Sequence, residues 1–428
     1  MDVSVTYGDK KIVLNIPEKN LACVIEPKHS NATSDVLSGI VRVLDNPQGP
    51  RLSDISKGKR VCVLVEDHTR DAPHLEMVSG ISSRLKDASK VQFIITTGSH
   101  EVKHPGNLEI VDMIKRVAED AKLSNYDILI HDCMTIDTVD LGNTKRGTPV
   151  IVNSAAIGHD VYVSCSDMKA HYFAGYSNVV KNFLPGVCAF PTIEANHAWA
   201  LSPKSTFGIH PFHPDESRRD NPLADDMREA MMMIARNAQI FLLAIVSDSR
   251  KIVWAGAGLP KPVTASAMKI LDEISSFTVT PKTRIVVSPG GYPQDKSLYH
   301  AQRAIELTKN AVVDGGEIMF LAECRDGVAP ESAIANFYDK LTAPLDDVID
   351  SISGKYHLYE HKAFKFAELL KRVSRIRMFT ELDEKTVQSA HLEKVNDPQK
   401  VIDEWIAENP TVNIMILDKG NKIAVYSD

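Results

Sequence analysis

The sequence predicts an α/β protein made of two α/β domains, with a largely parallel sheet in the N-terminal domain and an active site in the interdomain cleft. Strand-like apolar runs alternate with amphipathic helices from residue 60 onward. Polar residues follow several of these strands directly. A chain of 428 residues is also too long for one ordinary core, so at least two domains are expected.

The N-terminal half begins with a predicted β-hairpin around Gly8-Asp9, formed by residues 3–7 and 11–16. A helix is expected near residues 34–44. The alternation that follows has strands at 60–65, 90–96, 126–131, 150–152 and 161–164, and helices at 74–88 and 107–121. Strands and helices that alternate in this way predict a parallel sheet covered by helices.

A predicted helix at 222–237 is followed by two adjacent strands at 240–246 and 251–255. The domain boundary is expected directly after these strands. Because GAGLPKPV (256–263) resembles a linker, the predicted domains are 1–258 and 264–428. The second domain has predicted helices at 264–276, 296–309, 331–338, 344–352, 363–373 and 398–407, and strands at 284–288, 317–322, 375–379, 412–417 and 422–426.

Composition excludes several classes of protein. Charged residues make up 25% and hydrophobic residues 43%, which are globular values. The net charge of -7, without a basic run, argues against nucleic acid as a partner. The sequence contains no apolar stretch of about 18 residues, so a membrane span is not predicted, and the N-terminus has no signal-peptide core. The six cysteines form no CxxC pair, so we expect a reduced, cytoplasmic protein.

Polar side chains gather after four of the predicted strands. In a parallel sheet, ligands bind beyond the carboxyl ends of the strands. The residues at these ends are Asp67, Thr69 and Arg70, then Gly98, Ser99 and His100, then His131 and Asp132, and finally Ser166 and Asp167. They are predicted to form one side of a cleft. Arg70 suits a carboxylate, which a guanidinium binds through two parallel hydrogen bonds.

The stretch 171–199 carries little charge and contains His171, Lys181 and His197. A lysine in apolar surroundings has a lowered pKa and is nucleophilic, so it can hold a carbonyl-derived cofactor covalently. An imidazole nearby can bind a metal. Ser177 is a predicted N-cap of a short helix that carries Lys181. The next helix is expected to begin at Pro191 and to carry His197.

A third group of polar residues lies in GGYPQDKSLYHAQR (290–303), where a glycine-rich loop leads into a helix. Tyr299 and Arg303 are four residues apart and share one face, beside His300. The fingerprint GxGxxG is absent after the first strand of the alternation, so NAD bound in the Rossmann manner is not predicted.

Each of these residues also has an ordinary structural interpretation. Lys181 can extend to water, and the histidines can be hydrogen-bonded structural residues or, for His100, exposed on a loop. Arg70 can form a salt bridge at a helix start, and the helix with Tyr299 can be amphipathic with a polar face.

The combination of motifs nevertheless resembles the lactate racemase family. It comprises DHTR (67–70), TTGSH (96–100), HYFAGYSNVVKNFLPGV (171–187), NH (196–197) and GGYPQDKSLY (290–299). The resemblance covers nearly the whole chain and includes the two-domain layout. It implies an isomerase that inverts C2 of a 2-hydroxy acid. The implied cofactor is a nickel-pincer nucleotide, pyridinium-3,5-bisthiocarboxylic acid mononucleotide nickel.

The resemblance also implies a role for individual residues. Lys181 would hold the cofactor covalently, and His197 would bind nickel. His100 and His171 would be the acid–base pair on opposite faces of the substrate, while the C2 hydrogen moves as hydride to the cofactor and back. The other implied contacts are Asp67, Thr69 and Ser177 with the cofactor, and Arg70, Tyr299, His300 and Arg303 with the substrate.

Two departures from the family pattern bear on the substrate and the cofactor. Asn178-Val179 stands where relatives have glycines before the tethering lysine, and His300 and Arg303 stand where lactate racemases have Gln and Lys. We therefore expect a substrate larger or more polar than lactate. Expected partners are this acid, the proteins that make the cofactor and, as one option, a second copy in a homodimer. Two alternatives are a zinc-dependent hydrolase or lyase that uses His100, His171 and His197, and a non-catalytic small-acid binding protein.

Overall fold

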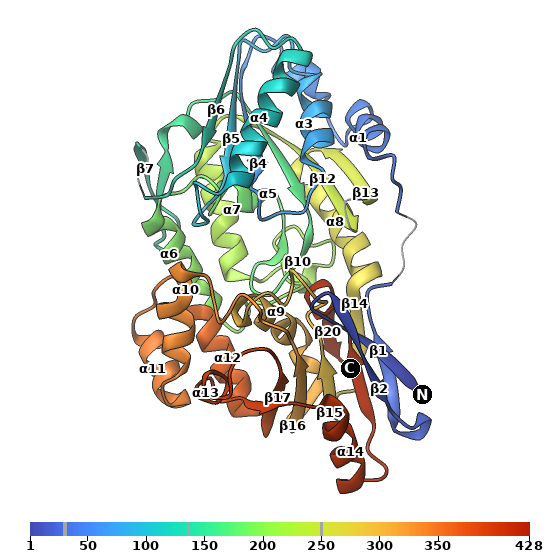
Figure 1. Ribbon diagram of the computed structural model, residues 1–428. Coiled ribbons are helices and arrows are strands. Elements are labelled where there is room, and N and C mark those ends of the chain that lie inside the picture. Colours follow the sequence, from blue (N-terminus) through green and yellow to red (C-terminus); the bar gives the residue numbers. More distant parts are fainter. Residues whose placement is uncertain (29–31, 135–136, 249–250) are drawn as a thin grey trace. The chain divides into compact units, whose positions relative to one another are not determined.

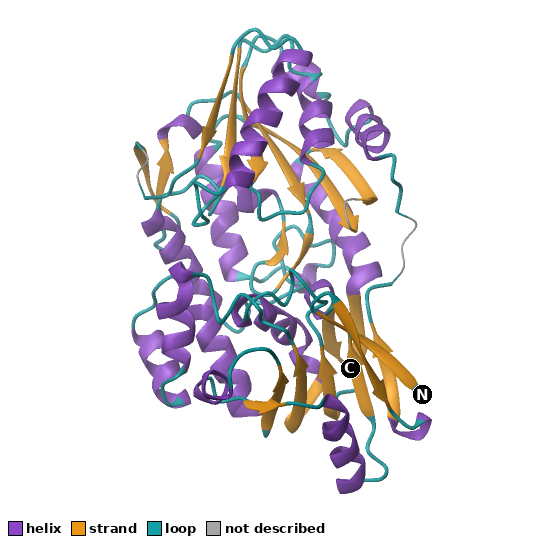
Figure 2. Cartoon of the chain, viewed as in Figure 1, coloured by secondary structure: helices purple, strands orange, loops and turns teal. Residues whose placement is uncertain are grey.

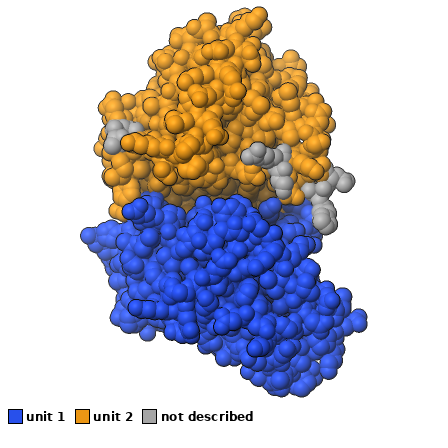
Figure 3. Space-filling model, in the orientation of Figure 1, with its two compact units in different colours: residues 1–29, 274–428 blue, residues 30–273 orange. Residues whose placement is uncertain are grey.

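Two groups of elements, each with its own six-stranded sheet, make up the chain (Figures 1 and 2). The computed structural model describes residues 1–28, 32–134, 137–248 and 251–428. One compact unit comprises residues 30–273, and the other combines residues 1–29 with 274–428 (Figure 3). We call them the central unit and the terminal unit.

The sheet of the central unit has the order β13-β12-β9-β4-β5-β6. Its neighbours are parallel except for β12 and β13, which confirms the predicted, largely parallel sheet. Residues 61–65 of β4 are at most 1% exposed, as expected for a strand covered on both faces. The strands are β4 (Arg60–Glu66), β5 (Lys90–Thr96), β6 (Tyr126–Ile130), β9 (Val161–Asp167), β12 (Gln239–Asp248) and β13 (Lys251–Gly258).

One face of this sheet shares a core with α1, α3 and α4, through residues such as Ile40, Val78 and Ile114 (Figure 1). The short helix α5 contacts β4 and β9, and also α7. The helices of the central unit are α1 (Val36–Asp45), α2 (Leu52–Ser56), α3 (His74–Ser82), α4 (Pro105–Asp120), α5 (Val179–Phe183), α6 (Phe190–Ala198), α7 (Pro222–Ile234) and α8 (Pro260–Ser275). Short 3-10 turns lie at Ser154–Ala156, Trp199–Leu201 and Glu216–Arg218.

Two small antiparallel sheets complete the central unit. β7 (Thr138–Asn143) pairs with β8 (Pro149–Asn153), and β10 (Lys169–His171) pairs with β11 (Gly175–Ser177). The prediction that residues 150–152 continue the parallel alternation is therefore wrong. Only a short turn joins β7 to β8, whereas a parallel pair needs a longer crossover.

The sheet of the terminal unit has the order β18-β17-β16-β15-β19-β3, and all its neighbours are parallel. Its strands are β3 (Leu21–Ile25), β15 (Lys282–Val287), β16 (Val312–Leu321), β17 (Arg375–Phe379), β18 (Glu393–Val395) and β19 (Ile414–Leu417). β20 (Ala424–Ser427) does not pair with β19 but lies beside β14 (Ser276–Val279).

The helices of the terminal unit are α9 (Leu298–Thr308), α10 (Glu331–Ile334), α11 (Leu345–Gly354), α12 (Glu360–Arg372), α13 (Glu384–Ser389) and α14 (Pro398–Glu408). Single turns lie at Glu18–Asn20, Lys309–Ala311 and Gly420–Lys422, and a π-helical turn at Ala335–Asp339 continues α10. Within the described residues, no helix is long and apolar enough to cross a membrane.

The first residues of the chain belong to the terminal unit, which corrects the predicted domain 1–258. β3 pairs in parallel with β19, with Leu21 beside Ile414 and Ile25 beside Leu417. The predicted hairpin is present as β1 (Asp2–Tyr7) and β2 (Lys10–Asn15), and its buried residues share a core with Trp405. Sequence proximity is a poor guide here, because a strand can join a sheet formed by the far end of the chain.

The predicted linker at 256–263 is also corrected. β13 continues to Gly258 and α8 begins at Pro260, so most of this segment is regular structure. The division between the units falls after residue 273, near the end of α8. Proline begins a helix without loss of a backbone hydrogen bond, so Pro260 marks a helix start rather than a linker.

Candidate active site

Asp67 and His100 meet beyond the carboxyl ends of the adjacent strands β4 and β5. An Asp67 carboxylate oxygen lies 2.8 Å from Nδ1 of His100. Asp67 is 2% exposed and also accepts a hydrogen bond of 2.6 Å from the Thr69 hydroxyl. Burial alone raises the pKa of Asp67, but His100, Arg70 and Thr69 outweigh it and hold that pKa below its usual value. The charged carboxylate therefore favours a proton on Nδ1 of His100 and leaves Nε2 to face elsewhere.

A glycine brings the loop of His100 against the segment that follows Lys181. Gly98 has a φ of +56°, and its N–H donates to the Gly186 carbonyl at 3.3 Å. A Cβ on Gly98 would lie 3.2 Å from the Pro185 ring. The motifs TTGSH and LPG thus pack on each other, which only a residue without a side chain allows at this φ.

Lys181 lies on α5, a helix whose start is fixed by Asn178. The Asn178 side chain accepts a hydrogen bond from the N–H of Val180 at 3.0 Å and donates to the Tyr176 carbonyl at 2.7 Å. The predicted N-cap, Ser177, instead belongs to strand β11 and is buried. This correction gives Asn178 a structural role at the start of α5. The side chain satisfies backbone groups at the start of the helix.

Asn182, the residue after Lys181, anchors α5 to the sheet. Its amide nitrogen donates to Ser164 Oγ and to the Cys165 carbonyl, both at 2.9 Å. Its amide oxygen accepts from the Thr96 hydroxyl at 3.2 Å. Asn182 is 4% exposed, so these hydrogen bonds are shielded from solvent. They fix the position of the helix that carries Lys181.

The ring of Phe173 lies among three nitrogen-bearing side chains. Its centroid is 4.4 Å from that of His171 and 5.4 Å from that of His197, and the Lys181 amine is 5.5 Å away. Lys181 Nζ lies 3.3 Å from Nε2 of His171. His171, Lys181 and His197, the three residues selected from the stretch 171–199, therefore lie close together in the structure. The local sequence explains it, since β10 and β11 form a tight hairpin around Phe173.

His197 is buried on α6, which begins at Phe190 with Pro191 in its first turn, as predicted. Burial first, and then the Lys181 cation, lower the pKa of His197 to about 3, and His100 contributes in the same direction. The imidazole is therefore neutral, the form in which histidine binds metals. Lys181 and His100 both act on it electrostatically, which places all the predicted catalytic nitrogens in one region of the central unit.

Acidic and basic groups gather at the carboxyl ends of β4 and β9. Burial raises the pKa of Glu66 to about 7, against the effect of the nearby Arg70 guanidinium. Glu66 accepts a hydrogen bond of 2.9 Å from the N–H of Asp167, which in turn pairs with Lys169 at 2.8 Å. Sequence reasoning did not select Glu66. The sequence did contain a signal for it, because Glu66 is the last residue of a strand that is buried from residue 61 onward and directly precedes Asp67.

Tyr299, His300 and Arg303 lie together on α9 of the terminal unit. Burial raises the pKa of Tyr299, so the phenol stays protonated. His300 Nδ1 is 2.7 Å from the Ser297 hydroxyl. Lys362 of α12, which sequence reasoning missed, places its amine 4.2 Å from the centre of the Tyr299 ring. Its helix has an ordinary amphipathic pattern, so only the fold reveals this contact.

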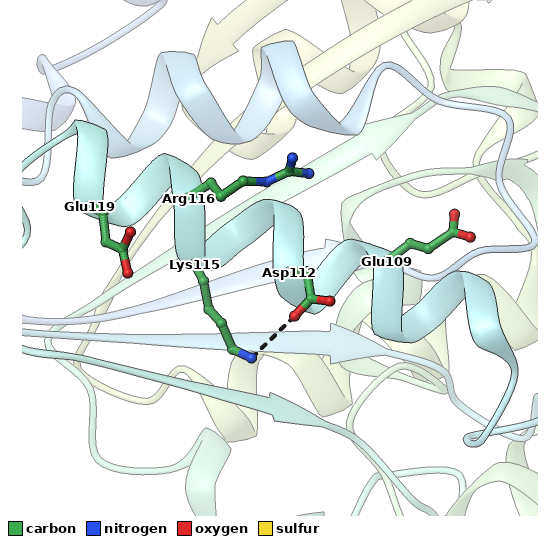
Figure 4. Close-up of a pocket in the computed structure, with 5 residues that line it drawn as sticks. All are labelled: Glu109, Asp112, Lys115, Arg116 and Glu119. Atoms are coloured by element: carbon green, nitrogen blue, oxygen red, sulfur yellow. Dashed lines mark hydrogen bonds and ion pairs between the residues drawn. The ribbon is translucent and has the colours of Figure 1, made fainter.

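A surface hollow in the central unit lies away from these residues, along the exposed side of α4 (Figure 4). Charged side chains of this one helix line it, and Lys115 pairs with Asp112 at 3.2 Å. No predicted site residue lines it. The lining residues are Glu109, Asp112, Lys115, Arg116 and Glu119. It is the solvated face of a helix.

The arrangement of donors bears on the zinc alternative. Across the part of the chain that the structure describes, no three His, Cys, Asp or Glu side chains are grouped to hold a metal ion. His100, His171 and His197 therefore do not form the three-ligand set that a catalytic zinc site needs. A cofactor that brings most of its own metal ligands needs only one imidazole from the protein.

Comparison with known proteins identifies the class and then the family. The chain is an isomerase of the racemase type. It belongs to the lactate racemase family: residues 7–208 match the lactate racemase N-terminal domain and residues 279–425 match the lactate racemase C-terminal domain.

Two curated relatives are lactate racemases. That of Thermoanaerobacterium thermosaccharolyticum is 28% identical over 336 residues, which cover 76% of this chain and 75% of the relative. That of Lactiplantibacillus plantarum is 26% identical over 351 residues, covering 79% and 78%.

Two solved structures share the fold. The lactate racemase apoprotein from Thermoanaerobacterium thermosaccharolyticum matches with a TM-score of 0.85 and 24% identity, over 100% of both chains. A protein from Thermotoga maritima matches with a TM-score of 0.64 and 14% identity, over 94% of this chain and 100% of its own.

Proposed function

We propose that the protein is a racemase or epimerase that inverts C2 of a 2-hydroxy acid with a nickel-pincer nucleotide attached to Lys181. The observation that carries this proposal is the convergence of Lys181, His171 and His197 around Phe173 in a chain of the lactate racemase family. The curated relatives are named for their action on lactate, a 2-hydroxy acid.

The residues present fit this cofactor. Lys181 is a partly buried amine on an anchored helix, suited to a covalent bond. The buried imidazole of His197 supplies one nitrogen ligand, and a square-planar set completed by the pincer suits Ni(II). When bound, the cofactor would accept and return a hydride at C2 of the substrate. Asp67, Thr69 and Ser177 are the proposed contacts around it.

His100 and His171 are the proposed proton carriers. Asp67 holds Nδ1 of His100, so Nε2 is the nitrogen free to exchange a proton with the substrate hydroxyl. The N–H of Ala174 donates to Nδ1 of His171 at 3.3 Å, so the neutral ring of His171 carries its proton on Nε2, the opposite tautomer to that of His100. One imidazole removes the hydroxyl proton of the bound enantiomer. The other imidazole, on the opposite face of the substrate, donates a proton to the oxygen when the other enantiomer forms.

Arg70 is the proposed partner of the substrate carboxylate, because its guanidinium can make two parallel hydrogen bonds with it. In the terminal unit, Tyr299, His300 and Arg303 are the proposed contacts for the rest of the substrate. The proteins that make the cofactor are required partners in this proposal, since the chain alone holds only the attachment point.

The test is to co-express the chain with cofactor-making proteins and to measure its intact mass. Wild type should gain the mass of the cofactor, and Lys181→Arg, which keeps the charge but not the primary amine, should not. The same preparations are then incubated with single enantiomers of 2-hydroxy acids. Wild type should lose their optical purity, and Lys181→Arg should not.

A matched variant separates the tether from the metal ligand. His197→Gln should keep the added mass but lose nickel, measured by elemental analysis of the same sample. An unmodified wild-type mass in a preparation that racemises 2-hydroxy acids would contradict the tether. A modified wild type that racemises none of these acids would contradict the reaction.

A further inference from the structure

Asn107 joins the loop that follows β4 to the loop that follows β5. It lies in the first turn of α4 and is 0% exposed. On one side, its amide oxygen accepts hydrogen bonds from the backbone N–H and from Nδ1 of His68, both at 3.1 Å. On the other side, its amide nitrogen donates to the carbonyls of Glu101 and Val102, at 3.0 and 3.2 Å. Both lone pairs of the oxygen and both protons of the nitrogen are therefore used.

The start of α4 is built closely around His68. A Cβ on Gly106 would lie only 2.7 Å from Cβ of His68, so a glycine is needed at this position. The His68 ring stacks on that of His104, with centroids 3.7 Å apart and planes inclined by 7°. Nδ1 of His104 caps the helix by accepting from the N–H of Gly106 at 3.1 Å. Burial lowers the pKa of His68, against the effect of its hydrogen bond to Asn107, so the stacked ring is uncharged at neutral pH.

These contacts flank the Asp67–His100 pair in the sequence. His68 directly follows Asp67, and Glu101 directly follows His100. The pair joins side chains from two separate loops, and that of His100 is 42% exposed. A hydrogen bond weakens steeply when donor and acceptor are misaligned, so the geometry of the pair depends on how the two loops are held.

We propose that Asn107 is a positioning residue of the reaction, which aligns the Asp67 carboxylate with Nδ1 of His100. This inference rests on the proposed function, in which His100 exchanges a proton with the substrate. Asn107 does not touch the substrate but acts through the pair. Without its hydrogen bonds both side chains remain, but their loops can move relative to each other. The imidazole then loses its fixed tautomer and orientation.

Two variants perturb this arrangement in different ways. Asn107→Ala removes the four hydrogen bonds, and Gly106→Ala adds a Cβ that pushes α4 away from His68. Asn20→Ala is the matched control, because Asn20 is also 0% exposed and also donates to two backbone carbonyls, at 3.0 and 2.9 Å, but within the terminal unit. Urea denaturation verifies that each variant folds, and Gly106→Ala decides the outcome if Asn107→Ala does not fold.

The cofactor-free protein, labelled with 15N-histidine, gives a readout that needs no activity. At pH 9, where imidazoles are neutral, the two ring 15N shifts show which nitrogen carries the proton. His100→Gln identifies the signals of His100. Wild type should carry the proton on Nδ1, beside Asp67. In Asn107→Ala and Gly106→Ala the share of this tautomer should fall toward that of an exposed histidine, and Asn20→Ala should match wild type.

The cofactor-loaded enzyme gives the second readout, the loss of optical purity of single-enantiomer 2-hydroxy acids. Asn107→Ala and Gly106→Ala should lower kcat by about ten- to hundredfold and leave KM within about twofold of wild type, because the proton transfer is misaligned and substrate binding is not. Asn20→Ala should keep both constants.

An unchanged tautomer of His100 in either variant once folded, or a loss that falls on KM instead of kcat, would overturn the inference and leave the racemase proposal standing. If the loaded wild type racemises none of the acids, the proposed function fails instead. The tautomer of His100 in the cofactor-free variants still decides whether Asn107 aligns the pair.

Discussion

The Asp67 carboxylate lies 2.8 Å from Nδ1 of His100, at the ends of two adjacent parallel strands. A buried carboxylate behind an imidazole selects the tautomer of that imidazole and fixes the orientation of the ring. The pair gives His100, whose side chain is 42% exposed, a fixed orientation that its loop alone would not provide.

Replacement of Asp67 by Asn should therefore reduce turnover far more than binding. The amide can hold the ring in the wrong tautomer, and we expect kcat to fall by roughly 10²- to 10⁴-fold with little change in KM. Chiral chromatography of the reaction mixture measures the rate, and intact mass verifies equal cofactor loading. A kcat within about threefold of wild type would exclude this role for Asp67.

Substitution of Gly186 by Ala should destabilise the central unit. A Cβ at this position would lie 2.2 Å from the backbone oxygen of Asn182, so the last turn of α5 would have to move. We expect a loss of roughly 1–3 kcal/mol in the free energy of unfolding, measured by urea denaturation. Gly354→Ala is the control, because a Cβ there meets no atom within 4 Å. Equal stabilities of the two variants would contradict the clash.

The buried Glu66 should make stability depend on pH. Its pKa is raised from 4.5 to about 7, so the folded state holds more protons than the unfolded state between these values. The stabilising contribution is complete below about pH 4.5 and is lost as pH rises through about 7. Between pH 5 and 8, wild type should lose on the order of 2–3 kcal/mol more than Glu66→Gln.

Urea denaturation of both proteins at the two pH values gives this difference, and contributions from other groups cancel. Glu109→Gln on the exposed side of α4 is the control and should follow wild type. If Glu66→Gln retains the full pH dependence of wild type, another group is responsible.

Removal of the Asp295 side chain should weaken the attachment of the N-terminal hairpin. The carboxylate is fully buried and accepts hydrogen bonds from the N–H of Gly8 at 2.7 Å and of Glu323 at 3.3 Å. Because these bonds involve a charged acceptor, Asp295→Ala should cost about 2–4 kcal/mol of stability. Asp9→Ala, which removes an exposed ion pair with Arg325 in the same turn, should cost under about 1 kcal/mol. Calorimetric unfolding that shows the reverse order would contradict this assignment.

The periodic parts of the chain were the parts that sequence reasoning predicted well. The bounds of β5 and β17 were predicted to the residue, because both are short apolar strands between clear helices. β3 was missed, since it is partly exposed, and its partner β19 lies almost a full chain length away. No local pattern encodes such a pairing.

In the candidate site, too, local motifs identified some residues, and only the fold reveals the others. Motifs singled out His171, Lys181 and His197, and the structure brings them together, but their roles stay predictions. The predicted N-cap of α5, Ser177, is one residue away from the observed N-cap, Asn178. Either residue type can cap a helix, and only the pairing of β11 decides between them. Lys362 carries no sequence signal at all.

The pairing of β3 with β19 also sets an order of events during protein synthesis. When residues 30–273 have left the ribosome, every strand of their own sheet is available, whereas residues 21–25 must wait until residues 414–417 are made. The nascent chain therefore carries an unpaired strand at its front through most of translation. Domains fold as units as they emerge, so the unit that bears Lys181 can fold before residues 274–428 of the terminal unit are made.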